Sequence, residues 1–254
     1  MSAIGIETLK LRRSGLARVT TLVLVLGCPL AGAGFLRLAG AAPGSPLAEK
    51  TAALMPADGW PGYLALVGEI LTVAVLLGGG IAMSWTFGRE FVDRTVYGLF
   101  ATAVPRWRTA GAKIAAVLAW LLLAVLAAVV VAILAGLLLG LGAPPAETWG
   151  AAGRSATAAA LCALMTTPLG WAASALRGYL PAVGALLALV VITEIGTALG
   201  AGAWFPYAAP GLWLGMGGPA AAAEVGAVQL GLAVPVGALG AVGTLVWWRA
   251  AEVV

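Results

Sequence analysis

Six long apolar segments, separated by short polar connections, dominate the chain. They cover residues 19–38, 63–87, 114–141, 155–176, 180–199 and 225–248. Each has the length of about 20 residues that an α-helix needs to cross the hydrocarbon core of a bilayer. The pattern therefore predicts six membrane-spanning helices.

Helices are expected because backbone N–H and C=O groups find no partner in lipid, so only helices or closed β-barrels can span it. The strict alternation typical of barrel strands is absent from the sequence. Composition agrees, because 62% of residues are hydrophobic and only 9% are charged. A soluble globule needs more polar side chains at its surface. We expect an all-α integral membrane protein with a single transmembrane domain over residues 1–254.

The 14 basic residues fall mainly on alternate connections. One side holds only Arg37, Lys50 and Arg154, and the remaining cations lie on the other. Short loops rich in Lys and Arg stay in the cytoplasm, so both termini are predicted to be cytoplasmic. The cations lie at membrane borders and form no stripe that could follow phosphates, so no nucleic-acid partner is expected.

The N-terminal segment, residues 4–19, is mildly amphipathic. It predicts either a helix lying along the inner membrane surface or a solvated basic tail. Its two faces are formed by Ile6, Leu9 and Leu16 against Lys10, Arg12 and Arg13. The following apolar run and residues 31–33 also resemble a secretory signal with its cleavage site. Cleavage would leave an odd number of spans and a mismatched charge balance, so the first helix is expected to be retained.

Catalytic chemistry is not indicated. The chain has no histidine, the commonest general base and metal ligand. Cys28 and Cys162 are single residues within apolar runs and are expected to serve in packing. A GxxxxGK[ST] phosphate-binding loop is absent, so the chain is not itself a P-loop ATPase. We predict no catalytic, cofactor-binding or metal site.

Three ionisable residues lie inside the predicted spans: Arg37, Glu69 and Glu194. A charge in hydrocarbon is costly unless it is paired or hydrated. All three are expected at similar depth near the outer side, where they predict a polar vestibule along a substrate path, or a salt bridge between Arg37 and a glutamate. Alternatively, Arg37 and Glu69 extend to the outer interface.

The connection over residues 201–219 contains no charge but is rich in glycine, proline and aromatic residues. Its aromatic side chains are Trp204, Phe205, Tyr207 and Trp213. The segment predicts either a hydrophobic hairpin of short re-entrant helices or an aromatic belt at the outer interface.

A polar island occupies residues 88–113, between the second and third spans. It carries Arg89, Glu90, Asp93, Arg94 and Thr95, then an apolar stretch, and finally Pro105, Arg106, Arg108 and Lys113. Residues 90–103 predict a short amphipathic helix ended by Pro105, because the residue before a proline disfavours helix. Its charged face is either free to dock a partner or anchored to lipid head groups.

This island resembles the connection between the second and third helices in the type-2 permease family of ABC transporters. The matching residues are Glu90, Thr95, Pro105, Arg106 and Lys113. Chain length, six spans, inner termini, the amphipathic N-terminal segment and the hairpin before the last helix match as well. One departure is Tyr97-Gly98, where the family usually has a small residue before a leucine-rich step.

The resemblance implies a permease that pairs with a second copy of itself or a close relative and with two copies of a separate ATPase subunit. ATP and Mg²⁺ would bind the ATPase, and Arg89, Glu90, Asp93 and Arg94 would be its docking charges. The short outer loops offer no dock for a binding protein, which favours export. By analogy, the cargo is a drug, antibiotic or peptide leaving across a bacterial cytoplasmic membrane, with antibiotic resistance as a common role.

Two other classes stay open. A proton-coupled secondary transporter would use Glu69 or Glu194 as its relay, but the sequence shows no inverted repeats. A polytopic membrane enzyme would need clustered acidic, histidine or serine residues, and the chain has no histidine and few acids within the spans.

Overall fold

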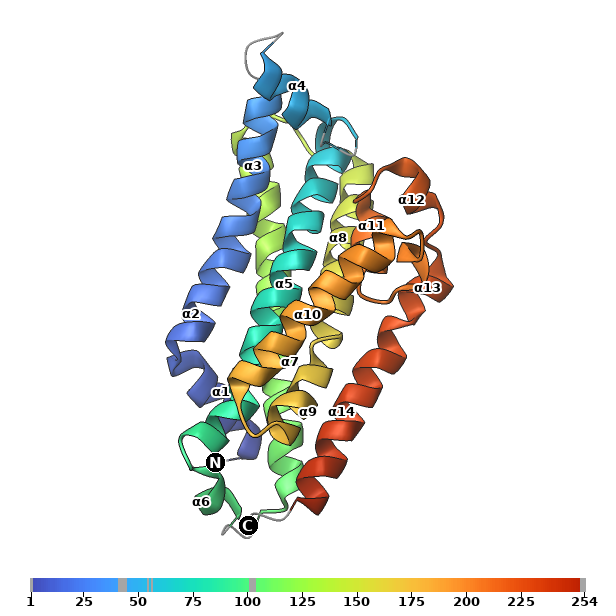
Figure 1. Ribbon diagram of the computed structural model, residues 1–254. Coiled ribbons are helices and arrows are strands. Elements are labelled where there is room, and N and C mark those ends of the chain that lie inside the picture. The colour runs from blue at the N-terminus through green and yellow to red at the C-terminus, as the bar shows by residue number, and fades with distance from the viewer. Residues whose placement is uncertain (1, 41–44, 54, 56, 101–103, 252–254) are drawn as a thin grey trace.

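The computed structural model describes residues 2–40, 45–53, 55, 57–100 and 104–251, and these residues form helices and turns without a β-strand. Within them, six helical segments are long and apolar enough to span a membrane, and they pack into an elongated bundle (Figure 1). The segments are Gly15–Ala39, Gly59–Val92, Arg106–Leu138, Ala146–Ala175, Tyr179–Ala198 and Ala227–Ala250. The predicted all-α membrane fold is confirmed.

The individual elements subdivide these segments where the hydrogen-bond pattern changes. In chain order they are α1 (Ala3–Arg13), α2 (Gly15–Leu22), η1 (Val23–Gly27), α3 (Cys28–Ala39), α4 (Pro46–Ala53), α5 (Gly59–Val92), α6 (Val96–Phe100), α7 (Arg106–Leu138), α8 (Ala146–Leu164), α9 (Thr167–Ala175), α10 (Tyr179–Ala198), η2 (Gly202–Trp204), α11 (Ala209–Leu214), α12 (Pro219–Ala223), α13 (Ala227–Gly231) and α14 (Ala233–Ala250).

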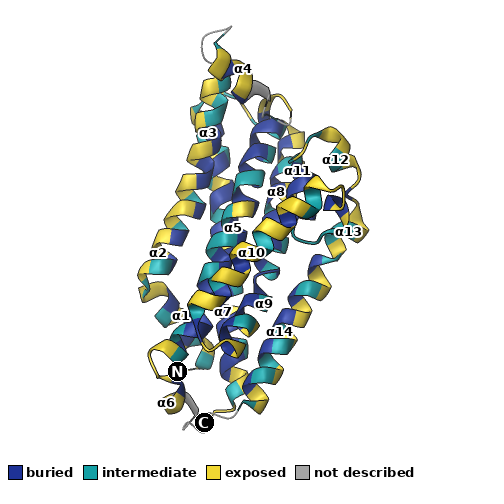
Figure 2. Cartoon of the chain, in the orientation of Figure 1, coloured by how far each residue is buried: buried dark blue, intermediate teal, exposed yellow. Residues whose placement is uncertain are grey.

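Helix α5 is the centre of the bundle and packs against α3, α7, α8, α9 and α10. Its glycines allow these neighbours to approach closely, as small residues do in membrane helices. A Cβ atom at Gly79 would lie 2.8 Å from Leu121, and one at Gly80 would lie 2.8 Å from Leu169 and Leu186. Figure 2 shows the resulting buried surface on α5 and the exposed outer faces of α10 and α14.

Large apolar side chains on the outer faces of the spans are exposed, among them Leu123, Leu138, Leu180 and Leu239. A water-soluble bundle would place polar residues at such positions, whereas lipid accepts apolar ones. The exposed faces therefore fit a hydrocarbon environment.

The first span is interrupted by a π-helical turn, η1, just before Pro29. A proline has no N–H to donate and its ring crowds the preceding turn, which disturbs the α-helical hydrogen bonds. The turn before the proline is wider than an α-helical turn, because the N–H of Cys28 donates to the carbonyl of Val23, five residues earlier. Such π-bulges are frequent at functional sites.

The fourth span is broken into α8 and α9, although the sequence predicted one helix over residues 155–176. Pro168 is responsible, because it cannot donate to the carbonyl of Leu164. The single hydroxyl proton of Thr167 has its nearer acceptor in α14, the carbonyl of Gly237 at 2.7 Å, and lies 3.1 Å from the carbonyl of Leu164. Tyr207, from the connection after α10, donates its hydroxyl to the carbonyl of Met165 at 3.1 Å. These hydrogen bonds connect the break to α14 and to the segment that follows α10.

The connections predicted to be cytoplasmic share one end of the bundle. Figure 1 places α1, α6 and the end of α14 there, and α4 and α12 at the opposite end. The Arg106 guanidinium donates to the carbonyl of Ala251, so the start of α7 lies beside the end of α14. We call this end, which carries the polar island, the basic end.

Candidate functional site

A cluster of four buried or half-buried charges lies at the basic end, centred on Lys113. The Lys113 side chain is 0% exposed, and its Nζ lies 2.7 Å from Glu90 Oε1 and 3.0 Å from Glu7 Oε2. Its third donor is directed at the carbonyl of Thr86, at 3.3 Å. An ammonium group has three donors, so Lys113 is fully satisfied.

Glu90 is equally well partnered. Its Oε1 also accepts from Lys10 Nζ at 3.4 Å, and its Oε2 accepts from the hydroxyl of Thr95. Lys10 additionally pairs with Glu7 at 2.9 Å. Two lysines thus balance two glutamates, and buried charges are tolerated when they are paired and hydrogen-bonded in this way. We refer to Glu7, Lys10, Glu90 and Lys113 as the ion cluster.

The ion cluster joins three helices that are distant in sequence. Glu7 and Lys10 come from α1, Glu90 from the last turn of α5, and Lys113 from α7, two turns after its start. Ser14 separates α1 from α2: its hydroxyl donates to the carbonyl of Leu11 and accepts from the N–H of Ala17 at 3.1 Å. This double cap folds α1 back against α7.

The N-terminal segment is a helix whose inward face, packed against α7, is not the one that its apolar residues indicate. Glu7 and Leu11 form its buried face, while Ile6 is 42% and Leu9 is 38% exposed. The interior at this position is polar, because it contains Lys113, so a carboxylate is the favoured inward residue. Ile6 and Leu9 face outward, where a membrane surface suits them.

The exposed residues beside the ion cluster form a surface of charged and aromatic side chains. A turn over residues 93–95 leads from α5 into α6, and α7 begins after Pro105. We call the surface formed by Asp93, Arg94, Tyr97, Trp107 and Arg108 the coupling surface, after the role that the sequence predicts for this connection, and all five residues are exposed. Arg94 adopts a left-handed conformation, with φ 55°, which turns the chain sharply there.

Two expectations for this connection are wrong. The predicted helix over residues 90–103 does not begin at Glu90, because α5 continues to Val92 and α6 spans only Val96–Phe100; residues 101–103 lie outside the described part. Glu90 is also not a freely exposed charge, since it is only 2% exposed and is held by Lys113. Because Glu90 is buried, it holds the end of α5 in place below the exposed residues and is not itself part of the surface.

The remaining charges of the polar island lie around this surface. The Arg89 guanidinium stacks on the Trp85 ring, 4.4 Å from its centroid, and is half-buried. Arg106 is half-buried against the end of α14. The turn from α9 to α10 packs against the end of α5. A Cβ at Gly88 would lie only 2.2 Å from the backbone nitrogen of Tyr179. Arg177 in that turn is the second residue with a left-handed φ, 52°.

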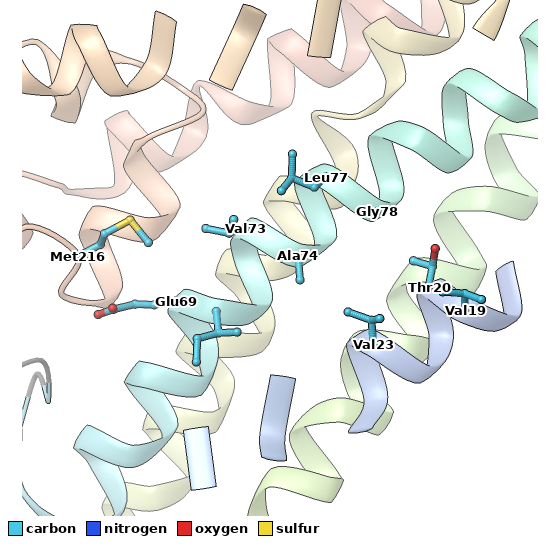
Figure 3. A pocket seen from close by; sticks show the side chains of 10 residues that line it. Val19, Thr20, Val23, Glu69, Val73, Ala74, Leu77, Gly78 and Met216 are labelled. Carbon is cyan, nitrogen blue, oxygen red and sulfur yellow. The ribbon is translucent and has the colours of Figure 1, made fainter. Parts of the chain in front are cut away.

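Glu69 lies far from the coupling surface, in the outer half of α5, where it borders two cavities. One is a cleft of about 610 Å³ between α5 and the α2–η1 segment. Figure 3 shows Glu69 and Met216 at one end of this cleft and Val19 and Thr20 at the other. The other is an outer cavity of about 900 Å³ that also contains Glu147 and Arg154.

The structure does not bring the three predicted intramembrane charges together. Arg37 is exposed in the last turn of α3, and the described residues show no ion pair between it and Glu69 or Glu194, so the predicted salt bridge is wrong. Glu194 is exposed on α10 and borders an adjoining cavity of about 260 Å³, which shares Val73, Leu77 and Met216 with the cleft.

The aromatic connection packs back onto the bundle. Helix α11 contacts α5 and α8, and Leu212 and Leu214 are buried. Tyr207 is directed at the break between α8 and α9, as described above, whereas Trp204 is 64% exposed. The rings of Phe205 and Tyr207 lie next to each other, with their centroids 6.2 Å apart. The Arg154 guanidinium lies over the Trp213 ring, 4.9 Å from its centroid. The four residues thus have distinct environments.

Sequence reasoning missed Glu7 and Met216. Glu7 is an acidic residue within a basic N-terminal segment, and that contrast was the available signal for a buried partner. Met216 borders the cleft, the outer cavity and the cavity beside Glu194. Nothing in its sequence context distinguishes it from an ordinary loop methionine.

Comparison with known families agrees with this architecture. A family model described as ABC-2 family transporter protein matches residues 3–194. Comparisons with curated proteins and with solved structures return no match. The matched region runs from α1 into α10 and therefore contains the ion cluster, the coupling surface and Glu69. The chain belongs to the ABC-2 family of transporter proteins and is a multi-pass permease subunit of an ABC transporter.

Proposed function

We propose that this permease, paired with a second copy of itself or a close relative, forms the pathway of an exporter in a bacterial cytoplasmic membrane. Two copies of a separate ATPase subunit would bind ATP and Mg²⁺ and dock on the coupling surface. The basic end then faces the cytoplasm, in agreement with the positive-inside rule.

The observation that supports this proposal most is the position of the coupling surface on the ion cluster. Helices α5 and α7 contain 34 and 33 residues, which corresponds to lengths of about 50 Å. The ion cluster fixes the end of α5 to α7 and α1 next to the exposed turn. A push on that turn is therefore transmitted to helices that run the length of the bundle.

The chemistry of the coupling surface suits a protein partner. Arginine and aromatic residues are enriched at the energetic centres of interfaces, and Arg94, Arg108, Tyr97 and Trp107 supply both. A partner can shift the permease between conformations only if its contacts differ between them. ATP-driven closure of an ATPase dimer would provide that difference by changing the spacing between its two docking sites.

Export is favoured because the described connections at the outer end are short or pack against the spans, and α4, between α3 and α5, packs against α3. Helices α7 and α8 are separated by only a few residues, and the connection after α10 packs against α5 and α8. These connections leave little surface for a substrate-delivering protein. The proposed cargo is a drug, an antibiotic or a peptide.

Reconstitution with the partner ATPase tests the proposal. We expect Arg94→Glu combined with Arg108→Glu to lower ATP-driven transport about tenfold or more, since reversing two interfacial charges costs several kcal/mol. The control is Lys50→Glu, which changes an exposed cation at the opposite end. Failure of any ATPase to associate would overturn the proposal. Transport that continues without ATP but stops when the proton gradient collapses would favour a proton relay through Glu69 or Glu194.

A further inference from the structure

We propose that the cleft between α5 and the α2–η1 segment, the α2–α5 cleft, binds a hydrophobic organic cation, with the positive charge beside Glu69. The inference rests on the proposed export function and identifies the substrate class. The cleft is lined by α2, η1 and α5, with Thr20, Val23, Glu69, Val73 and Ala74 among its residues, and by Met216.

The cleft has the size and lining of a small-molecule site. Its volume of about 610 Å³ falls within the usual range for ligand pockets. From Glu69 to Gly78 it follows α5 for about 14 Å. The lining is apolar apart from Thr20 and Glu69, and the Thr20 side chain lies at the far end from the carboxylate (Figure 3). The cleft therefore offers a long apolar wall with one acidic group at its end.

Within the described part of the chain, Glu69 has no partner for the charge it would carry. Its Oε1 is buried and has no hydrogen-bond partner among the described residues. Arg154, in the adjoining outer cavity, donates instead to the carbonyl of Trp213 at 2.6 Å. Arg37 is exposed on α3 and forms no ion pair within the described part of the chain. A carboxylate in apolar surroundings is costly unless a cation pairs with it, and it disfavours an anion.

The cleft is accessible from the side of the bundle. Val19, Val23 and Val73 at its edge are 61%, 49% and 45% exposed, on faces of spanning helices that suit lipid. A ligand with an apolar body can therefore enter from the bilayer. Glu69 and Met216 also border the outer cavity of about 900 Å³, which continues from the carboxylate end of the cleft. The charged end of the ligand thus lies nearest to the outer exit.

Two hydrophobic ions of the same shape and opposite charge provide the test: tetraphenylphosphonium and tetraphenylborate. Binding of each ion is measured separately to the permease in nanodiscs, with and without the ATPase, and the signal from protein-free nanodiscs is subtracted. We expect the wild type to prefer the cation. Glu69→Gln should weaken cation binding about tenfold or more and leave anion binding unchanged or stronger, because it removes one charge of a buried pair.

Two further variants locate the site. Ala74→Trp fills the cleft and should weaken binding of both ions. Glu194→Gln removes the carboxylate of the neighbouring cavity and should leave cation binding within about twofold of the wild type. Glu69→Asp keeps the negative charge and should therefore keep the preference for the cation. If the Glu69→Gln protein cannot be purified, the comparison of Glu69→Asp with the wild type replaces it.

Several results would overturn the inference. One is a wild type without a preference for tetraphenylphosphonium, and another is a Glu69→Gln variant that affects both ions equally. Unchanged binding in Ala74→Trp would indicate that lipid or the second permease copy occupies the cleft. If ATPase docks and hydrolyses ATP while the cation does not bind, only this inference fails. If the cation binds at Glu69 but no ATPase associates, only the proposed function fails.

Discussion

Lys113 Nζ lies 2.7 Å from Glu90 Oε1 at a position where the two side chains are 0% and 3% exposed. This pair connects the last turn of α5 to the body of α7, on either side of the connection that carries the coupling surface. A buried pair of this kind adds little net stability compared with apolar packing, but loss of one partner is severe. Its value lies in fixing how the two helices are placed relative to each other.

Replacing Lys113 by Met should destabilise the protein by about 3–5 kcal/mol, because Glu90 and Glu7 would be left buried with only half-exposed Lys10 to balance them. Thermal unfolding of the purified permease in detergent measures the effect. The double variant Lys113→Met with Glu90→Gln should recover much of the lost stability. Lys50→Met, at an exposed position, is the control. A single variant as stable as this control would show that the ion cluster does not hold the helices.

Arg94 combines an unfavourable backbone with an exposed charge, and the two contributions can be separated. A non-glycine residue in the left-handed region costs about 1 kcal/mol, so Arg94→Gly should leave stability unchanged or raise it by that amount. The same change should weaken ATPase binding, which is measured by titrating the ATPase onto the reconstituted permease.

Arg177→Gly is the matched comparison, because Arg177 has nearly the same φ of 52° and lies outside the coupling surface. It should show the same effect on stability without the loss of ATPase affinity. Equal losses of affinity in both variants would contradict the assignment of Arg94 to the docking site.

The six spans could be predicted from the sequence because lipid imposes a length and a composition on every helix that crosses it. The predicted segment 180–199 agrees closely with α10, Tyr179–Ala198. The break between α8 and α9 could not be predicted, because Pro168 can either kink a helix or end it. The outcome depends on the hydrogen bonds from Thr167 to Gly237 and from Tyr207 to Met165, and each of them joins residues that are distant in sequence.

The candidate site was predictable as a segment but not as a set of contacts. The sequence placed Glu90 and Lys113 in one polar island, yet their pairing depends on how α5 and α7 pack. Glu7 contacts Lys113 as well, although the two residues are 106 positions apart in the sequence. A single sequence contains no information on such distant contacts, so Glu90 was expected at the surface.

Gly88 should not tolerate a side chain, because the turn from α9 to α10 lies directly against it. A Cβ would meet the Tyr179 nitrogen at 2.2 Å, and a backbone atom cannot move aside as the end of a flexible side chain can. Gly88→Ala should therefore destabilise the protein by about 2 kcal/mol or more. Gly98→Ala is the control, since a Cβ there meets nothing within 4 Å. Comparable thermal stability of the two variants would contradict the packing at Gly88.

Tyr207→Phe removes the hydroxyl that donates to the carbonyl of Met165 while keeping the ring. Because Pro168 disrupts the helix at this point and lipid offers no replacement donor, the carbonyl should remain unsatisfied, at a cost of about 1–2 kcal/mol. Thermal unfolding in lipid nanodiscs measures this loss, and Trp204→Phe, at a 64% exposed position, is the control. The connection after α10 should also loosen, which hydrogen exchange over residues 202–214 would detect as faster exchange. Unchanged stability together with unchanged exchange would mean that the break between α8 and α9 is satisfied without Tyr207, and the connection would then be held by the packing of α11 on α5 and α8 alone.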